Sequence, residues 1–501
     1  MPKRAFLAFD LGAESGRSIL GVLHNNRIEL RDLNRFANSH VNLPSGLHWN
    51  LTNLYANMVD GLALASRHCA EHDCELVSLG VDTWGVDFGL IGRSGQLLGM
   101  PFIYRDPRTV ATMQQAFDTL GRERIYHDTG VQFMNLNSLY QLLALQQSEP
   151  ALIAEAERLL FTPDLMHYFF TGEAVNEATI ASTSQMVNPR HTGISTTGEW
   201  AVSLLEDLGL STHMLGPIAP AGTTVGVVRD SLASEIRGGH GVKVVAPASH
   251  DTASAVVAAP AQPGTNWCYL SCGTWSLLGA ELDQPVITDA AREAPFTNEG
   301  GYGGTVRFLQ NITGLWMVQE CRRDYDKRGE TFDYATLTQL AADAPPFRTI
   351  VETRHSPFLL PGDMLDKIAD YARQTAQPIP ETPGQFIRCC LESLALTYRR
   401  TLEQLQSVLD RKFDVLHLVG GGGKNELLCQ MTADALHLPV VAGPYEATAM
   451  GNVLVQAIAA GELKDLAQAR ELVQASISPR LYDPRDSAAW TAAYERFARL
   501  G

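Results

Sequence analysis

The sequence predicts an α/β protein built from two similar domains, and three observations lead to this fold class. A short apolar strand, a turn of small residues and a second strand occur in order at residues 5–23 and again at 267–282. A long helical pattern at 385–409 precedes an apolar strand at 415–419. The chain of 501 residues is also longer than one domain usually is. An internal duplication is the economical explanation of the repeated strand–turn–strand unit.

The first hundred residues are predicted to be mainly strands, and their first turn has the composition of an anion site. Asp10 follows the apolar run 5–9, and residues 12–16 (Gly-Ala-Glu-Ser-Gly) form the turn. Dinucleotide-binding loops and Walker loops open a helix, whereas residues 18–23 read as a strand, so this turn joins two strands of a hairpin. Its backbone N–H groups, its serine hydroxyl and Arg17 can still face an anion. A plain hairpin turn is the alternative.

Two glycine-containing segments of the second half have similar properties. The turn Ser271-Cys272-Gly273-Thr274 offers hydroxyl and backbone donors, and two such loops facing each other would hold a polyphosphate from both sides. Four glycines at 420–423 follow a strand, and Asn425 is a good N-cap for the helix expected next. Glycines let the backbone approach a flat ring or a phosphate closely. A flexible loop is the alternative for the glycine run.

A carboxylate near the expected domain junction is a candidate general base. Asp251 lies between His250 and Thr252, just before the Ala- and Pro-rich stretch that marks the junction. A carboxylate in this place can take a proton from a hydroxyl. It can also start a helix over residues 252–257, with Ser249 or Asp251 as the N-cap, and the residues alone favour the cap.

Composition and charge exclude several classes of protein. The net charge of −16 argues against nucleic acid as a partner, because such binding needs a basic face. No apolar run approaches the roughly 20 residues that cross a bilayer, and no signal peptide is evident at the start, so we expect a cytoplasmic protein without membrane contact. The eight cysteines contain no CxxC pair and are expected to be reduced there.

Nine segments together resemble the FGGY carbohydrate kinases. In chain order they read DLGAESGR, GVDTWGVDF, YRDPRT, ASHDTASAV, SCGTWSLLG, TNEGG, QNITGLW, LVGGG and GPYEATAMGN. The resemblance covers residues 5–458, nearly the whole chain, and order and spacing make it specific. It implies two ribonuclease-H-like domains of the actin/hexokinase type around a central cleft. The domains would be 1–248 (sugar and phosphate side) and 249–460 (nucleotide side), followed by a helical segment at 461–501.

The resemblance also implies a reaction. ATP, with Mg²⁺, would phosphorylate a ketose at its primary hydroxyl O1. The residues of GVDTWGVDF and ASHDTASAV favour L-rhamnulose as the ketose. The products would then be L-rhamnulose 1-phosphate and ADP. Another ketose, such as L-fuculose or L-xylulose, is one alternative, and a non-catalytic ATP-binding relative of actin or the Hsp70 chaperones is another. A dehydrogenase is disfavoured by the strand after the first turn. The sequence does not give the oligomeric state.

Several residues match functional positions of that family. The residues that match its nucleotide-binding positions are Ala13, Glu14, Ser15, Gly16, Arg17, Thr274, Gln319 and Gly421. The residues that match its sugar-binding positions are Gly85, His250, Asp251, Thr252 and Asn311, with Asp251 as the proton acceptor.

The family match also bears on metal binding and on the cysteines. Asp10 matches an aspartate near Mg²⁺, which it would reach through water. An aspartate beside a phosphate needs such a cation, because two anions repel each other. Cys69 and Cys389 fall where some relatives form disulfides, but their partners are missing, so we expect none.

Overall fold

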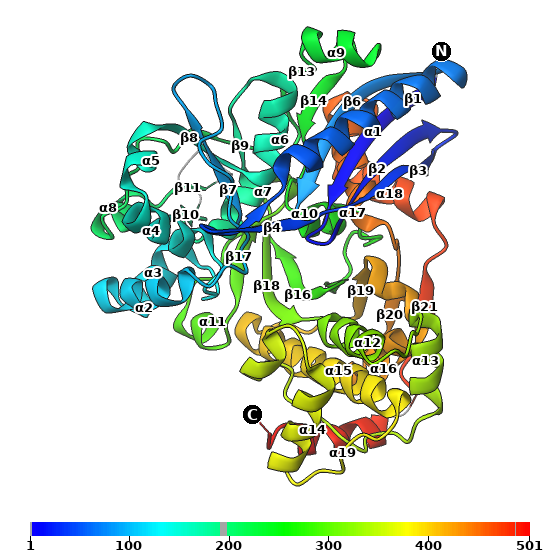
Figure 1. Cartoon of the computed structure of the whole chain (residues 1–501). Coiled ribbons are helices and arrows are strands. Elements are labelled where there is room, and N and C mark those ends of the chain that lie inside the picture. The colour runs from blue at the N-terminus through cyan, green and yellow to red at the C-terminus, as the bar shows by residue number, and fades with distance from the viewer. Residues whose placement is uncertain (1–2, 191–197, 486, 501) are drawn as a thin grey trace. The chain divides into compact units, whose positions relative to one another are not determined.

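The computed structural model describes residues 3–190, 198–485 and 487–500. The chain divides into two compact units that are not consecutive in sequence (Figure 1). Unit 1 consists of Met1–Ala258, Glu281–Phe308 and Ala447–Ser476, and unit 2 of Ala259–Ala280, Leu309–Glu446 and Ile477–Gly501. This grouping differs from the three consecutive segments expected from the sequence. The reason is that helix α17 (Ala447–Ala459), late in the chain, packs on the first strand.

Unit 1 contains a six-stranded mixed sheet. Its strands lie in the order β13 (Thr223–Val227), β14 (Lys243–Ala246), β6 (Cys74–Thr83), β1 (Lys3–Leu11), β2 (Ser15–His24) and β3 (Arg27–Ala37). Strands β1, β2 and β3 are antiparallel hairpins, as the strand after the first turn predicted, and β1 pairs with β6 in parallel. The carboxyl ends of β1 and β6 therefore meet at one edge, the edge at which open α/β sheets bind ligands.

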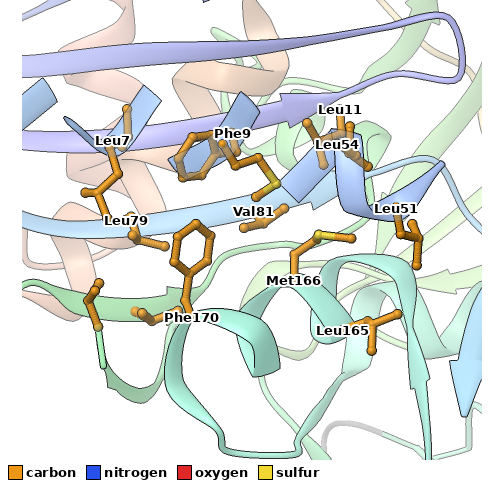
Figure 2. Close-up of a cluster of buried hydrophobic side chains, with 14 of the residues drawn as sticks. Leu7, Phe9, Leu11, Leu51, Leu54, Leu79, Val81, Leu165, Met166 and Phe170 are labelled. Carbon is orange, nitrogen blue, oxygen red and sulfur yellow. The ribbon is translucent and has the colours of Figure 1, made fainter. Parts of the chain in front are cut away.

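One face of this sheet is apolar. Side chains alternate along β1 and β6, and every second one joins a cluster with helices α1 (Leu51–Glu71) and α6 (Thr162–Thr171). Figure 2 shows that Phe9 and Val81 point into this cluster, where Met166 and Phe170 of α6 meet them. The rings of Phe9 and Phe170 stack with centroids 5.7 Å apart. Helix α1 is an exception to the prediction that the first hundred residues are mainly strands.

The opposite face of β1 and β6 is covered by α17, and on β6 it carries the polar residues Ser78 and Asp82. Ser78 Oγ donates to Gln456 Oε1 (2.7 Å), Gln456 Nε2 donates to Asn452 Oδ1 (2.6 Å), and Asn452 Nδ2 donates to Asp82 Oδ2 (2.6 Å). Gly80 leaves room for this chain, since a Cβ there would lie 2.8 Å from Asn452 Oδ1. A buried ladder of hydrogen bonds thus runs along the sheet and ends at Asp82.

Unit 2 is built around a second mixed sheet. The seven strands of this sheet lie in the order β17 (Thr297–Gly300), β18 (Val306–Thr313), β16 (Trp275–Leu282), β15 (Trp267–Cys272), β19 (Val415–Val419), β20 (Val440–Ala442) and β21 (Arg480–Tyr482). The division into units assigns β17 and the first residues of β18 to unit 1. Its main helices are α12 (Trp316–Lys327), α13 (Tyr334–Asp343), α14 (Met364–Gln374), α15 (Pro383–Leu409) and α16 (Glu426–Leu436). The hairpin at 267–282, the long helix near 385–409 and the strand 415–419 were all predicted from the sequence.

The last 41 residues are not only helical. Helix α18 (Leu466–Ser476) belongs to unit 1, whereas α19 (Ser487–Phe497) belongs to unit 2. Strand β21 lies between them and pairs antiparallel with β20, which closes that edge of the second sheet. The eight cysteines are free thiols. Within the residues described, no helix combines the length and the apolar character that a membrane span requires.

The remaining longer elements belong to unit 1. They are β7 (Phe88–Gly92), α2 (Thr109–Leu120), α3 (Arg122–Thr129), α4 (Ser138–Ser148), α5 (Pro150–Glu155), β8 (Ala156–Phe161), α8 (Val202–Asp207), α9 (Asp230–Ile236), α10 (Asp251–Val257), α11 (Asp289–Glu293) and β17 (Thr297–Gly300). Of these, α10 and β17 carry residues of the candidate site.

Candidate active site

The loop between β1 and β2 is short and rigidly held. The Gly12 N–H donates to the Ser15 carbonyl (2.8 Å), which closes the turn. Asn38 forms hydrogen bonds with two carbonyls of the loop. Its Nδ2 donates to Gly12 O (2.9 Å), and its backbone N–H donates to Glu14 O (3.0 Å). These carbonyls are therefore turned towards Asn38, which removes them from the side that would meet an anion. Ala13 and Glu14 form the tip, and Gly16 is buried behind it.

A charged pair flanks this loop. Asp10 and Arg17 face each other across the hairpin, and Arg17 Nη2 donates to Asp10 Oδ2. Both side chains are largely buried. Arg17 therefore brings its charge to the loop together with that of Asp10, and the two nearly cancel.

Asp82 is a third charged group at this sheet edge, and the sequence analysis missed it. It stands opposite Asp10 in the parallel β1–β6 ladder and is wholly buried. Its Oδ1 has no hydrogen-bond partner in the part of the chain that the structure describes. Burial raises the pKa of Asp82 well above its usual range, and the charges of Asp10 and Asp251 act in the same direction. The sequence contains one sign of this role: Asp82 ends an apolar strand just as Asp10 does.

Asp251 is the first residue of helix α10, not its N-cap. The N-cap position belongs to His250, whose side chain makes no capping bond, and this corrects the capping expectation. Asp251 Oδ1 instead accepts from the Thr252 N–H (2.6 Å) and the Thr252 hydroxyl (3.2 Å). His250 bridges to Thr83 at the end of β6, so Asp251 lies at the same sheet edge as Asp82. About one third of the Asp251 side chain is exposed.

Gly85 lies in a strained turn just after β6. The next residue, Val86, has φ = 69°, which a β-branched residue rarely adopts. The turn is held in this form because Asp87 N–H donates to Gly85 O (2.9 Å) and Val86 N–H donates to Thr183 Oγ1 (3.0 Å). A Cβ at Gly85 would lie 3.1–3.3 Å from three Thr183 atoms, so Thr183 fixes the turn from one side.

The Asp87 carboxylate anchors the residues around this turn. Its Oδ2 accepts from the indole N–H groups of Trp49 (2.7 Å) and Trp84 (2.9 Å), and its Oδ1 accepts from Gln141 (2.9 Å). Burial raises the pKa of Asp87 to about 6, although these hydrogen bonds act in the opposite direction. The motif GVDTWGVDF therefore supplies two buried carboxylates, one to the sheet edge and one to the scaffold of the turn.

The hairpin loop of unit 2 is neutral. The Gly273 N–H donates to Trp275 O (2.8 Å), and the Gly273 carbonyl accepts from the Leu315 N–H (2.9 Å) just before α12. Gln319 of α12 donates to Thr274 Oγ1 (3.1 Å). Because that hydroxyl accepts from Gln319, its own hydrogen is directed elsewhere and can be donated.

The glycine run packs directly behind this second loop. A Cβ at Gly422 would lie 2.3 Å from Cys272 Sγ, and one at Gly420 would lie 3.2 Å from the Cys272 carbonyl. A Cβ at Gly421, by contrast, would meet no atom within 4 Å. Asn425 caps helix α16 through Leu428 N (2.9 Å), as predicted. Gly421 is thus the glycine whose exposed side is open to a ligand.

The candidate residues therefore form two groups. Those of unit 1 meet at the ends of β1 and β6 and comprise Asp10, Ala13, Glu14, Ser15, Gly16, Arg17, Gly85, His250, Asp251 and Thr252. Those of unit 2 comprise Thr274, Asn311, Gln319 and Gly421. The structure joins Thr274 to Gln319 directly, whereas Asn311 lies half-buried on β18.

Sequence comparison decides the family of the chain. Residues 5–258 match the N-terminal domain of the FGGY family of carbohydrate kinases, and residues 268–460 match its C-terminal domain. The chain belongs to this family. It is therefore a carbohydrate kinase, an enzyme class that uses ATP, and the predicted fold of two α/β domains of the actin/hexokinase type is confirmed.

Individual relatives agree with this assignment along the full chain. The rhamnulokinase of Bacteroides thetaiotaomicron is 43% identical and covers 99% of this chain and 99% of its own length. That of Oceanobacillus iheyensis is 38% identical and covers 95% of this chain and 97% of its own length. The crystal structure of gluconate kinase from Lactobacillus acidophilus superposes with a TM-score of 0.80 at 15% identity, covering 99% of this chain and 97% of that one, which shows the shared fold.

Proposed function

We propose that this FGGY kinase transfers the γ-phosphoryl group of ATP to O1 of L-rhamnulose, giving L-rhamnulose 1-phosphate and ADP. The full-length similarity to rhamnulokinases supports the choice of sugar. The geometric observation that carries the proposal is Asp251: a carboxylate about one third exposed, with one oxygen held by Thr252, at the sheet edge that also bears Asp10 and Arg17. Because the reaction consumes ATP, we place the protein in the cytoplasm.

In this mechanism Asp251 is the general base. O1 of the sugar donates its proton to the carboxylate as O1 attacks the γ-phosphorus and ADP leaves. Phosphoryl transfer has a loose transition state, so positioning and charge stabilisation contribute most of the rate. The base adds roughly 10²–10⁴-fold. His250 and Thr252 hold the base, and together with Gly85 and Asn311 they are the proposed sugar contacts.

Nucleotide contacts are proposed for the hairpin loop of each unit by itself. The segment Ala13–Arg17 and the Thr274 hydroxyl donate to phosphate oxygens, and Gln319 orients Thr274 for this. Gly421 is exposed, and its open side accepts the flat face of the nucleotide base.

The residues at the sheet edge fit a magnesium ion held largely through water. Asp82 Oδ1 is a buried carboxylate oxygen without a partner among the residues described, and Asp10 is its neighbour across the ladder. In the described part of the chain, the only acidic or histidine cluster with ligand atoms all within 4.8 Å is Glu123, His127 and Asp289, so Asp10, Asp82 and Asp251 do not form a closed cage. Mg²⁺ commonly keeps several waters and uses one or two carboxylates. When bound, it would neutralise phosphate charge beside Asp10.

A coupled ADP-release assay across a panel of ketoses tests the proposal. We expect L-rhamnulose to give the highest kcat/KM, at least about tenfold above L-fuculose and L-xylulose, because a sugar hydroxyl that loses its partner costs about 1–3 kcal/mol. A higher kcat/KM for another ketose would correct the substrate but keep the chemistry. ATP turnover that is indifferent to every sugar would overturn the proposal in favour of a non-catalytic ATP-binding protein.

A further inference from the structure

The imidazole of His250 lies among three charged groups of unit 1, which includes the first residues of β18. Its Nε2 is 3.4 Å from Asp251 Oδ1 on α10. Its Nδ1 is 3.1 Å from Glu299 Oε2 on β17 and 3.0 Å from Arg307 Nη2 on β18. Arg307 is fully buried and Glu299 nearly so. A positioning pair of buried charges therefore stands directly behind the residue that precedes the proposed base.

Arg307 and Glu299 are fixed by each other and by the backbone. Arg307 Nη2 donates to Glu299 Oε2 (2.9 Å), and its Nε donates to the Gly300 carbonyl (2.9 Å). Burial would raise the pKa of Glu299, but the charges of Arg307 and His250 outweigh it and hold the pKa below its usual value. Because removing one partner of a buried pair is costly, both side chains have little freedom to move.

This arrangement selects where His250 carries its hydrogen. A guanidinium group can only donate and a carboxylate can only accept, so Arg307 (3.0 Å) favours Nδ1 as an acceptor while Glu299 (3.1 Å) favours it as a donor. Nε2, by contrast, lies near the acceptor Asp251 Oδ1 (3.4 Å), which favours a hydrogen on Nε2. The hydrogen of the neutral imidazole then resides on Nε2, which faces Asp251. If the ring gains a second proton, that proton meets Glu299, and Nε2 still carries a hydrogen. The disfavoured form is the neutral ring with its hydrogen on Nδ1, because that hydrogen would meet the Arg307 N–H and the bare Nε2 would stand against the acceptor Asp251 Oδ1.

We propose that Arg307 and Glu299 are positioning residues that hold the Nε2–H of His250 towards Asp251 Oδ1 and so leave Oδ2 to accept the sugar proton. Oδ1 already accepts twice from Thr252. Oδ2 has no hydrogen-bond partner among the residues that the structure places. In the reaction the O1–H bond breaks, its proton goes to Oδ2, O1 bonds to the γ-phosphorus, and the bond from that phosphorus to ADP breaks. This inference rests on the proposed function.

A double-mutant cycle on kcat tests the inference. Glu299→Gln, His250→Asn and the double variant are compared with the wild type, and thermal unfolding confirms that each is folded. We expect Glu299→Gln alone to lower kcat about 10- to 100-fold, since small misplacements of a catalytic group cost that much. In the His250→Asn background the same change should cost less than about twofold, because Glu299 acts through His250. Glu299→Asp, which keeps the charge, should recover part of the loss.

Glu352→Gln is the matched control, because Glu352 forms a largely buried pair with Arg400 (2.6 and 2.8 Å) in unit 2. It should leave kcat within about twofold in both backgrounds. If Glu299→Gln does not fold, the same cycle is run with Arg307→Lys. Equal losses with and without His250, or an unchanged kcat in folded Glu299→Gln, would overturn the inference alone. Absence of wild-type turnover with every sugar would overturn the proposed function, and the inference with it.

Discussion

The hairpin loop of unit 1, between β1 and β2, and that of unit 2, between β15 and β16, are each closed by a glycine N–H but differ in length and in charge. In each loop, a glycine N–H donates to the carbonyl at the start of the second strand, and the distance between the nitrogen and the oxygen is 2.8 Å in both. The residue two positions before the glycine differs between the loops. In the first hairpin it is Asp10, which faces Arg17, and in the second it is Ser271, which faces Leu277. The repeat thus preserves a closing hydrogen bond from a glycine, whereas the length of the loop and the side chains beside it change.

This difference divides the proposed chemistry between the two loops. The first loop lies beside Asp10, Asp82 and Asp251, and phosphate can approach such acidic groups only when a cation offsets them. The second loop offers the neutral Thr274 hydroxyl, oriented by Gln319, which can donate to phosphate without a cation. Unit 1 is therefore expected to supply the base and the metal-dependent contacts, and unit 2 the direct hydrogen bonds.

The largest expected effect comes from removing the base in unit 1. Asp251→Asn should lower kcat roughly 10²–10⁴-fold, because an amide cannot take the proton from O1. Steady-state kinetics with the preferred ketose measures this.

Asp230→Asn is the matched control, since Asp230 is also the first residue of a seven-residue helix of unit 1. Its turnover should stay within about twofold of the wild type. Near-normal turnover of folded Asp251→Asn would show that Asp251 is not the general base.

The buried carboxyl group of Asp87 in unit 1 should also make the free energy of unfolding depend on pH. Asp87 has a pKa of about 6 in the folded chain because of burial, against about 3.9 in an unfolded one. Between these values the folded state binds more protons, so the free energy of unfolding falls as pH rises from about 4 to 6, by about 3 kcal/mol. Urea unfolding at several pH values measures this slope. In Asp87→Asn, the fall in the free energy of unfolding between pH 4 and 6 should be smaller by about 3 kcal/mol. An equal fall in both proteins would contradict the account.

A smaller effect distinguishes the packing behind the two loops. A Cβ at Gly16 would lie 2.2 Å from the ring of Phe36, which is half-buried and can shift, whereas one at Gly422 would lie 2.3 Å from the buried Cys272 thiol. Overpacking typically costs about 1–3 kcal/mol. We expect Gly422→Ala to lie at the upper end of that range and Gly16→Ala at the lower end, measured by urea unfolding.

Gly421→Ala is the control, because its Cβ would meet no atom within 4 Å. It should leave stability within about 0.5 kcal/mol of the wild type and raise the KM for ATP. A larger stability loss in Gly16→Ala than in Gly422→Ala would reverse the comparison.

Local sequence patterns were sufficient to predict the loops themselves. The strand after residue 17 separated a hairpin from a helix-opening loop, and the same pattern at 267–282 identified its counterpart. The Asn425 cap was also predictable, because a cap depends on residues only a few positions away. The position of Asp251 within its helix was not, since Ser, His and Asp in sequence offer several starting points.

The groups that support the site depend on distant partners, and the sequence did not reveal them. His250 and Arg307 are 57 positions apart, and Asp82 and Asn452 are 370 apart, so only the folded chain brings them together. Burial decides the chemistry of Asp82 and Glu299, and burial of a charged residue is the exception that sequence patterns do not anticipate. The grouping into non-consecutive units likewise depends on a distant contact, because α17 returns to the first sheet.

The unequal roles of the two loops are tested most directly by measuring ADP affinity calorimetrically with and without Mg²⁺ in the wild type, Asp10→Asn and Thr274→Val. We expect Thr274→Val to weaken ADP binding about 3- to 10-fold equally in both conditions, the effect of one lost hydrogen bond. Asp10→Asn should strengthen binding without Mg²⁺, because a repelling anion is gone, and should abolish the gain that Mg²⁺ gives the wild type. An unchanged Mg²⁺ gain in Asp10→Asn, or its loss in Thr274→Val, would contradict the account.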